Sequence, residues 1–150
     1  MKHHALAKIF TLVLVLSLVL TAFVGCGKQP APEVGATATV IVEDGKTYTV
    51  PLAEVNGSNL FAVLDYLKEK QGLTYEAASG FISAVDGLAQ DAAAGKYIYL
   101  YTSVEEDFDV SAYAMTKTVG DKTLTSSGVG AAEMHVTDGA VIYIGTIIWS

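Results

Sequence analysis

The sequence from residue 58 to residue 72 reads SNLFAVLDYLKEKQG. Its apolar side chains recur at the i, i+3, i+4 and i+7 spacing of one helical face, and they are Leu60, Val63, Leu64 and Leu67. Charged residues lie off this stripe, which is typical of a helix that packs one face on a core. Ser58 or Asn59 can cap the first turn, and Gly72 stands where a left-handed C-cap belongs. The stretch therefore predicts an amphipathic helix over residues 59–71.

A β-hairpin is predicted upstream of this helix. Residues 37–42 and 47–50 are rich in Thr, Val, Ile and Tyr, and Asp44-Gly45 stands between them. Asp-Gly at such a place favours a hairpin turn, because type I′ turns need positive φ angles. Pro51 has no N–H to donate, so it either ends the second strand or restricts it to a sheet edge.

The chain after the helix reads mainly as strands. Extended segments are predicted at residues 73–76 and 81–85, a strand at residues 96–102 and a small hairpin around residues 119–122. Residues 140–149 are almost wholly apolar, which is typical of a central strand covered on both faces. The order of hairpin, helix and strands predicts an α+β fold of the β-grasp-like type, with a mixed sheet packed on one main helix.

The N-terminus resembles a bacterial lipoprotein signal peptide. Two lysines and no acid precede an apolar run over residues 9–24. As a helix this run would extend roughly 24 Å, which is short of the ~30 Å hydrocarbon core of a bilayer. It ends in FVGC at residues 23–26, which resembles the lipobox, where the cysteine receives a diacylglycerol and becomes the new N-terminus. We predict a signal peptide over residues 1–25, lipidation of Cys26 and an extracytoplasmic location on the cell membrane.

The chain after the cleavage site reads as a short tether and one acidic domain. Residues 26–36 are expected to be the lipidated cysteine and a flexible tether, since they combine small residues and prolines without periodicity, and residues 37–150 form the domain. The mature chain has seven lysines, no arginine and sixteen acids, a net charge of −9. Nucleic acid and anionic ligands are therefore poor candidates. Cys26 is the only cysteine, so no internal disulfide is expected.

Four segments of the chain carry a family resemblance. They are SNLFAVL at residues 58–64, GFISAVDG at residues 80–87, the strand at residues 97–102 and VTDGA at residues 136–140. In this order they resemble the domain of unknown function related to the C-terminal β-domain of transcobalamin and intrinsic factor, which is common in lipoproteins of Gram-positive gut bacteria. The resemblance covers residues 37–148. It implies a β-grasp-like fold and a role in binding cobalamin or another corrinoid.

The strand at residues 96–102 carries the most suggestive candidate site, since its alternation places three tyrosines on one face. Flat rings with polar tips suit a large planar ligand or a protein partner. The predicted ligand-binding residues are Tyr97, Tyr99, Tyr101 and Thr102. Trp149 can either extend the same surface or project from the domain without packing. A structural interpretation stays open, because tyrosines on a half-buried strand also pack beneath a loop, here residues 105–132.

Metal binding and catalysis find less support. The acidic run Glu105, Glu106, Asp107 and Asp109 offers oxygen ligands for Ca²⁺, but it lacks the residue order of a known calcium loop, which favours a solvated loop. His135 is the only histidine of the mature chain and can ligate a corrinoid cobalt, although a lone histidine is more often structural. No Gly-x-Ser-x-Gly, His-Glu-x-x-His or Walker sequence occurs. We expect a protein that is not an enzyme and has no metal or cofactor of its own.

Two functions are compatible with these features. The first is a surface-tethered module whose aromatic sheet face binds a small planar or hydrophobic ligand, with cobalamin or a related corrinoid as the specific candidate. The second is a protein-interaction or structural module of the cell envelope, in which the same face or residues 105–132 dock onto another exported protein. In both cases the lipid anchor is the contact with the membrane.

Overall fold

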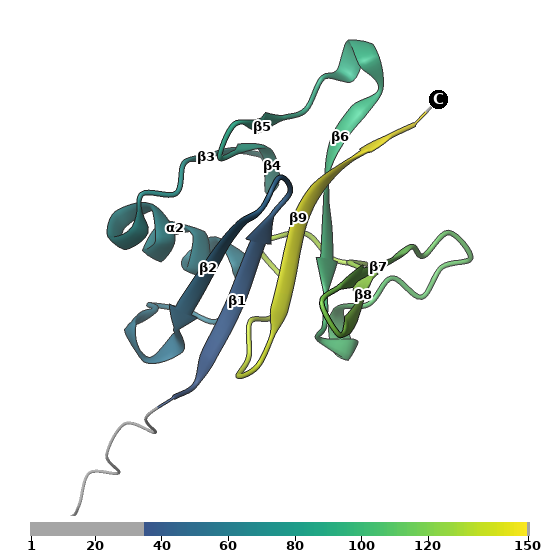
Figure 1. The fold of residues 1–150 in the computed structure, drawn as a ribbon. Coiled ribbons are helices and arrows are strands. Elements are labelled where there is room, and N and C mark those ends of the chain that lie inside the picture. The colour runs from purple at the N-terminus through teal and green to yellow at the C-terminus, as the bar shows by residue number, and fades with distance from the viewer. Residues whose placement is uncertain (1–34, 150) are drawn as a thin grey trace, which may run out of the picture. The chain divides into compact units, whose positions relative to one another are not determined.

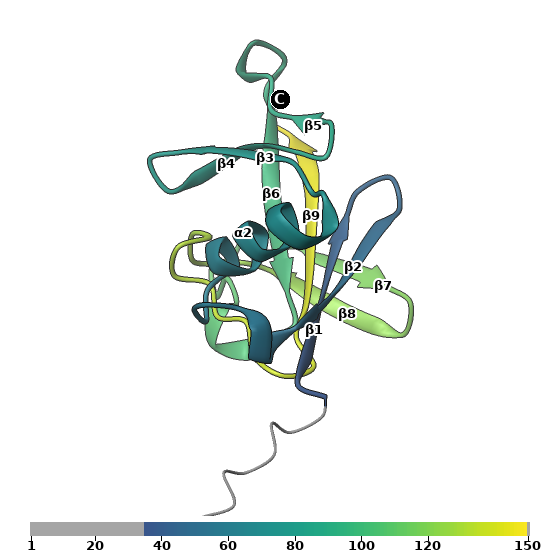
Figure 2. The ribbon, with the colours of Figure 1, turned by 90° about the vertical axis from the view of Figure 1, so that its left-hand side faces the viewer.

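A six-stranded mixed sheet lies at the centre of the structure, a computed structural model that describes residues 35–149 (Figure 1). In spatial order its strands are β2 (Lys46–Pro51), β1 (Thr37–Val42), β9 (Val141–Ile148), β6 (Lys96–Thr102), β8 (Lys122–Ser126) and β7 (Thr116–Val119). The helix α2 (Leu60–Gln71) crosses one face of this sheet (Figure 2). On the same side lies a small sheet of β3 (Tyr75–Ala78), β4 (Phe81–Val85) and β5 (Leu88–Ala89).

Three short 3-10 turns connect these elements within residues 35–149. They are η1 (Leu52–Glu54), η2 (Ala92–Ala94) and η3 (Glu105–Asp107). With strands forming most of the regular structure and one α-helix packed on them, the described part of the chain is an α+β structure, as the sequence predicts.

The β1–β2 hairpin forms where the sequence predicts it. The two strands pair from Thr37 opposite Pro51 to the turn. Asp44 and Gly45 in that turn have φ angles of 74° and 100°, as the Asp-Gly step requires. β2 is an edge strand and Pro51 is its last residue. The missing proline N–H therefore interrupts no ladder inside the sheet.

β9 is a central strand of the large sheet. It pairs parallel to β1 and antiparallel to β6, which makes the sheet mixed. Ile142 and Ile144 are completely buried in the main core, whereas Tyr143 is buried in a smaller cluster with Tyr101. Both faces of the strand are thus covered, which explains its nearly continuous apolar sequence. The prediction of a central strand at the end of the chain is confirmed.

The helix α2 begins and ends at the predicted caps. The Asn59 side chain accepts a hydrogen bond from the Ala62 N–H at 2.9 Å, and Gly72 adopts the left-handed conformation with φ 74°. The stripe residues are completely buried, and they are Leu60, Val63, Leu64 and Leu67. Burial of an aliphatic side chain contributes roughly 1.5–3 kcal/mol. This stripe therefore provides most of the attachment of α2 to the sheet.

The opposite face of the sheet carries the smaller cluster. Tyr101, Leu124 and Tyr143 are buried in it, and Leu124 belongs to β8. Lys117 of β7 holds its ammonium group 4.2 Å from the centre of the Tyr143 ring, a cation–π contact. The predicted hairpin around residues 119–122 is confirmed as the β7–β8 connection. This hairpin covers the part of the sheet where β6 ends.

One predicted segment begins two residues too early. The sequence predicts an extended segment at residues 73–76, whereas β3 begins at Tyr75. Leu73 is nevertheless buried, and its N–H donates to the Leu67 C=O at 3.3 Å. This bond belongs to the C-terminal cap of α2. The apolar character of Leu73 therefore reflects packing after the helix and not the start of a strand.

The predictions for the N-terminus concern a different part of the chain. The signal peptide over residues 1–25, the lipidated Cys26 and most of the tether lie outside the described residues. β1 begins at Thr37. Between residues 35 and 149, no helix is both long enough and apolar enough to cross a membrane.

Candidate ligand-binding site

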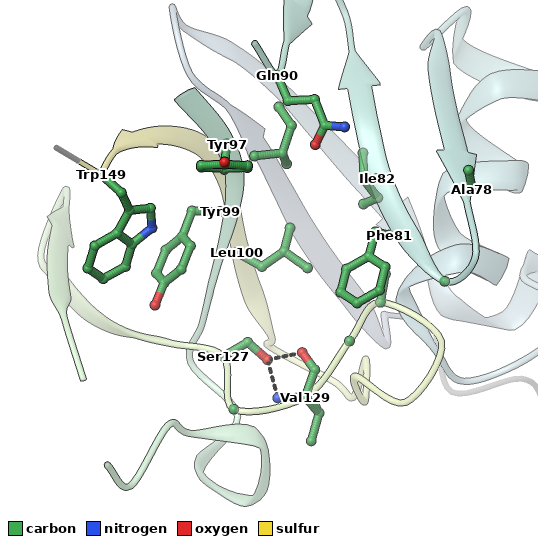
Figure 3. Close-up of a pocket in the computed structure, with 15 residues that line it drawn as sticks. Ala78, Phe81, Ile82, Gln90, Tyr97, Tyr99, Leu100, Ser127, Val129 and Trp149 are labelled. Atoms are coloured by element: carbon green, nitrogen blue, oxygen red, sulfur yellow. Dashed lines mark hydrogen bonds between the residues drawn. The ribbon is translucent and has the colours of Figure 1, made fainter. Parts of the chain in front are cut away.

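A cavity of about 660 Å³ opens beside the first half of β6, and we name it the β6 cavity (Figure 3). This volume lies within the roughly 300–1,000 Å³ that is typical of small-molecule sites. Its walls come from β4, β6, the loop after β8 and the end of the chain after β9. The large apolar and aromatic side chains among its lining residues are Phe81, Ile82, Tyr97, Ile98, Tyr99, Leu100 and Trp149. Segments far apart in the sequence thus form a single cavity.

Aromatic rings form two opposite walls of the β6 cavity. Figure 3 shows Tyr99 and Trp149 on one side of β6, and Phe81 and Ile82 on the other. Phe81 is 73% exposed, Trp149 is 56% exposed and Tyr97 is 39% exposed. Large apolar side chains that are exposed together are typical of a binding surface. A flat ligand between the walls would remove these rings from water.

The sheet leaves this part of β6 open because β8 is short. β9 pairs with β6 along its whole length, whereas β8 pairs with it only at Tyr101 and Thr102. After Ser126 the chain continues as a loop over residues 127–131, which supplies the lower wall in Figure 3. The edge of β6 before Tyr101 therefore faces the cavity.

Ser127 fixes the loop of the lower wall. Its hydroxyl group donates to the Val129 C=O at 2.9 Å and accepts from the Val129 N–H at 3.2 Å (Figure 3). Such serine bonds replace the backbone bonds that a turn lacks. The backbone N–H of Ser127 also donates to the Leu100 C=O at 2.8 Å. The loop is thereby attached to the edge of β6.

Two of the four predicted ligand-binding residues, Tyr97 and Tyr99, line the β6 cavity. Tyr101 is buried, and its ring packs edge-to-face against the Tyr99 ring with 5.5 Å between the centroids. Thr102 is completely buried, and its hydroxyl group accepts from the Val104 N–H at 3.0 Å. The structure therefore places Tyr101 under the β7–β8 hairpin. The side chain of Thr102 is buried on the other face of β6, and neither residue lines the cavity.

The β6 cavity is uncharged. Within the described part of the chain, no Asp, Glu, Lys or His lines it. The polar side chains in its lining are those of Gln90, Tyr97, Tyr99 and Ser127. An ionic ligand would lose hydration there without gaining an opposite charge. The cavity therefore suits a neutral ligand with an apolar body and a few hydrogen-bonding groups.

Sequence reasoning missed Phe81, Ile82 and Val129 as site residues. Phe81 and Ile82 lie in the segment that carries the family resemblance, and Val129 lies between two glycines. Neither pattern indicates that these segments meet at β6. The alternation in β4 is the one available signal, because it requires that one of Phe81 and Ile82 faces outward, and that residue is Phe81.

His135 does not line the β6 cavity and instead contacts Asp107 of η3. The Asp107 carboxylate accepts from the His135 backbone N–H at 2.6 Å and lies 2.8 Å from the imidazole Nδ1. The hydrogen bond to Asp107, assisted by the charge of that carboxylate, raises the pKa of His135 above its usual value. The Asp107 side chain is only 2% exposed. Its two bonds to His135 join η3 to the segment that precedes β9.

The carboxylates considered for calcium do not converge on one point. Asp107 is bound to His135, and Asp109 accepts a hydrogen bond within its own loop. Glu105 and Glu106 line a second, more polar cavity of about 510 Å³. Within residues 35–149, no group of three or more His, Cys, Asp or Glu side chains could hold a metal ion.

Comparisons with known proteins give a likeness in structure and none in sequence. No protein-family model matches the chain, and no curated protein matches it. Among solved structures, it is similar to a protein from Ruminococcus gnavus that is described as a "putative metal binding protein". The two share 16% sequence identity, and the likeness covers 76% of this chain and 96% of that chain with a TM-score of 0.43. At this TM-score the likeness carries no inference about the fold or ligand of this chain.

Proposed function

We propose that the protein is a lipid-anchored, non-catalytic binding protein of the extracytoplasmic surface, whose β6 cavity holds a small planar or hydrophobic ligand. The observation that carries this proposal is the uncharged cavity with aromatic side chains on both sides of a strand edge. Such walls bind apolar molecules by burial and orient flat ones by stacking. Lipidation of Cys26 would keep the cavity at the membrane surface.

Cobalamin or a related corrinoid is the specific ligand that we propose. Its support is the family resemblance over residues 37–148, together with a β-grasp-like assignment of the fold. The order of the β1–β2 hairpin, α2 and a last strand parallel to β1 favours that assignment. In this proposal Tyr97 and Tyr99 contact the ligand, and Phe81 and Trp149 enclose it.

A visible-absorbance titration tests the proposal. The mature chain from residue 26, with Cys26→Ser to prevent lipidation, is titrated with cobalamin and with cobinamide. We expect a saturable absorbance shift in the micromolar range. Tyr99→Ala and Trp149→Ala should each weaken binding about tenfold or more, because each removes an aromatic contact of the size that dominates binding sites.

Tyr113→Ala is the matched control for these variants. Tyr113 is 79% exposed and does not line the β6 cavity, so its loss should leave binding unchanged. Absence of any absorbance shift at high micromolar ligand would remove the corrinoid version. Binding that withstands both Tyr99→Ala and Trp149→Ala would remove the assignment to this cavity.

A protein-interaction module is the second candidate, and the exposed rim of the cavity favours it. Phe81, Tyr97 and Trp149 line the cavity and are large apolar residues that stay exposed. A partner protein would cover such a rim as readily as a small ligand. This candidate prevails if Tyr99→Ala abolishes co-purification of an exported partner and leaves small-molecule binding unchanged.

A further inference from the structure

On the side of β6 that faces away from β9, backbone pairing is interrupted beside the β6 cavity. At one end, Asp91 and Lys96 exchange two backbone hydrogen bonds, of 2.8 and 2.9 Å. At the other end, the Ser127 N–H donates to the Leu100 C=O at 2.8 Å. Between these points, no strand of residues 35–149 pairs with β6 on this side. We name the stretch from Lys96 to Leu100 the β6 window.

Ile98 presents its backbone groups to the β6 window. On the side of β6 that pairs with β9, the Gly95 C=O accepts from the Trp149 N–H at 3.0 Å. The backbone N–H and C=O groups of the odd-numbered β6 residues therefore point toward β9. Backbone direction alternates along a strand, so the N–H and C=O of even-numbered residues point the other way. Those of Lys96 are already bonded, whereas those of Ile98 have no partner within residues 35–149.

A single amino-acid residue in extended conformation could pair with both free backbone groups of Ile98. In an antiparallel pair, two opposite residues exchange two hydrogen bonds through their own N–H and C=O groups. Ile98 is half-buried and borders an apolar cavity, where unpaired backbone groups are costly. A ligand that supplies one acceptor and one donor at this spacing would satisfy both groups.

The length of the β6 window limits the ligand. Lys96 and Leu100 are separated by four steps of about 3.3 Å each, or roughly 13 Å. Asp91 and Ser127 occupy the position of the next strand at the two ends. A long strand therefore cannot pair along the whole edge of β6, because Asp91 and Ser127 block its path. For the same reason, β6 of a second copy of the chain cannot pair with this edge. A peptide of about three residues fits this length.

The two walls would receive alternate side chains of such a peptide. A residue opposite Ile98 has its side chain on the same face of the sheet as Ile98, which belongs to the core that contains Ile82. The neighbouring peptide residues point to the other face, toward Tyr99 and Trp149 (Figure 3). Both walls are apolar and uncharged, so they select uncharged, apolar side chains.

We propose that the β6 cavity binds a short peptide of about three uncharged, apolar residues, whose central residue pairs with Ile98 as an added β-bridge. This inference rests on the proposed function only in treating the β6 cavity as a ligand site. It names the chemical class of the ligand from the backbone geometry of the strand edge.

Isothermal titration calorimetry on the unlipidated mature chain tests the pairing. The probes are acetylated, amidated tripeptides built from Phe, Leu, Val and Tyr, and at least one should bind with a Kd below about 1 mM. Replacing the central peptide N–H of that probe by an ester oxygen should weaken binding about tenfold, because the Ile98 C=O loses its donor. Failure of the whole panel, or equal affinity for the ester analogue, would overturn the proposal.

Amide hydrogen exchange locates the contact without altering the protein. The Ile98 N–H should become protected about tenfold or more in the complex. The Lys96 N–H is already bonded to Asp91 and serves as the internal control, with unchanged exchange. Peptide binding that leaves Ile98 unprotected would overturn the added bridge. Trp149→Ala should weaken peptide binding, whereas Tyr113→Ala should not.

Titration of the same preparation with cobalamin separates this inference from the proposed function. Peptide binding without cobalamin binding supports the inference and removes the corrinoid version. Cobalamin binding without peptide binding overturns the inference and leaves the proposed function standing. If neither ligand binds and circular dichroism shows a folded protein, the inference and the corrinoid version of the proposed function both fail.

Discussion

Asp107 is a nearly buried carboxylate that depends on one residue, His135, for two of its contacts. A buried carboxylate is stable only when its lost hydration is replaced by hydrogen bonds or opposite charge. Because a carboxylate only accepts, the hydrogen between the two side chains lies on Nδ1 of His135. Protonation of the exposed side of the imidazole then adds a positive charge beside Asp107.

The stability of the protein should therefore depend on the protonation of His135. Its folded-state pKa is raised by Asp107, so its contribution is fully present below the unfolded pKa of about 6.5 and is lost as pH rises through the raised value. Urea unfolding of the parent and of His135→Gln should differ most below about pH 6, and the difference should fall to a smaller constant value above the raised pKa, where neutral His135 still donates its Nδ1–H to Asp107. A difference that stays constant with pH would contradict this.

Gly95 controls how closely the end of the chain approaches β6. It has φ 66°, and a Cβ atom there would collide with the backbone C=O of Trp149. Gly95→Ala should therefore displace Trp149 from its wall of the β6 cavity. Trp149 is the only tryptophan, so a red shift of its fluorescence reports the displacement. Gly139→Ala is the control, because Gly139 has φ 72° but open space around its Cβ position.

Comparing the two substitutions separates the backbone strain of a positive φ angle from the collision with Trp149. Both substitutions place alanine in the left-handed region, which costs about 1–2 kcal/mol. Only Gly95→Ala should lose additional stability and shift the emission of Trp149. Equal effects of the two substitutions would show that the contact between Gly95 and Trp149 does not hold the end of the chain.

At the level of elements, the buried stripe of α2 carries the attachment of the helix. Leu64 is completely buried in the main core, and Leu64→Ala should lower the free energy of unfolding by about 2–5 kcal/mol. Glu69→Ala on the exposed side should change it by less than about 0.5 kcal/mol. Chemical denaturation monitored by circular dichroism measures both. A loss at Glu69 as large as that at Leu64 would contradict the assigned face.

The elements could be predicted where their signals are local. The caps at Asn59 and Gly72 and the Asp44-Gly45 turn each need only a few neighbouring residues, and all three are confirmed. The predicted start of β3 was wrong because an apolar residue such as Leu73 can be buried either in a strand or in a helix cap. Apolar character reports burial and does not identify the element that is buried.

The candidate site was predictable only in part, because it depends on how far each neighbouring strand extends. Alternation placed Tyr99 and Tyr101 on one face, and both belong to the same cluster on that face. It could not show that β8 covers Tyr101 and leaves Tyr97 open. The contribution of Phe81 is likewise a long-range contact, which no local pattern contains.

For the whole molecule, charge argues against adsorption to an anionic membrane without an anchor. The chain from residue 26 onward carries seven lysines against sixteen acids and no arginine. A basic patch adds about 1 kcal/mol per Lys or Arg to the attraction of a protein to an anionic leaflet, and an excess of acids reverses that attraction. Unaided adsorption to such a membrane is therefore unfavourable. The predicted attachment to a membrane would therefore need apolar insertion, which the predicted lipid on Cys26 would supply.

Cys26→Ser should accordingly abolish lipidation, because serine lacks the thiol that receives the diacylglycerol. Cells expressing the protein are grown with a palmitate analogue, and incorporation into the purified protein is measured together with the mass of its N-terminal peptide. The parent should carry label on a peptide that begins at Cys26, and Cys26→Ser should carry none. Thr21→Ala is the control, since it keeps the cysteine and the apolar run and should be labelled like the parent. Label on Cys26→Ser, or an unlabelled parent that still begins at residue 26, would contradict the anchor.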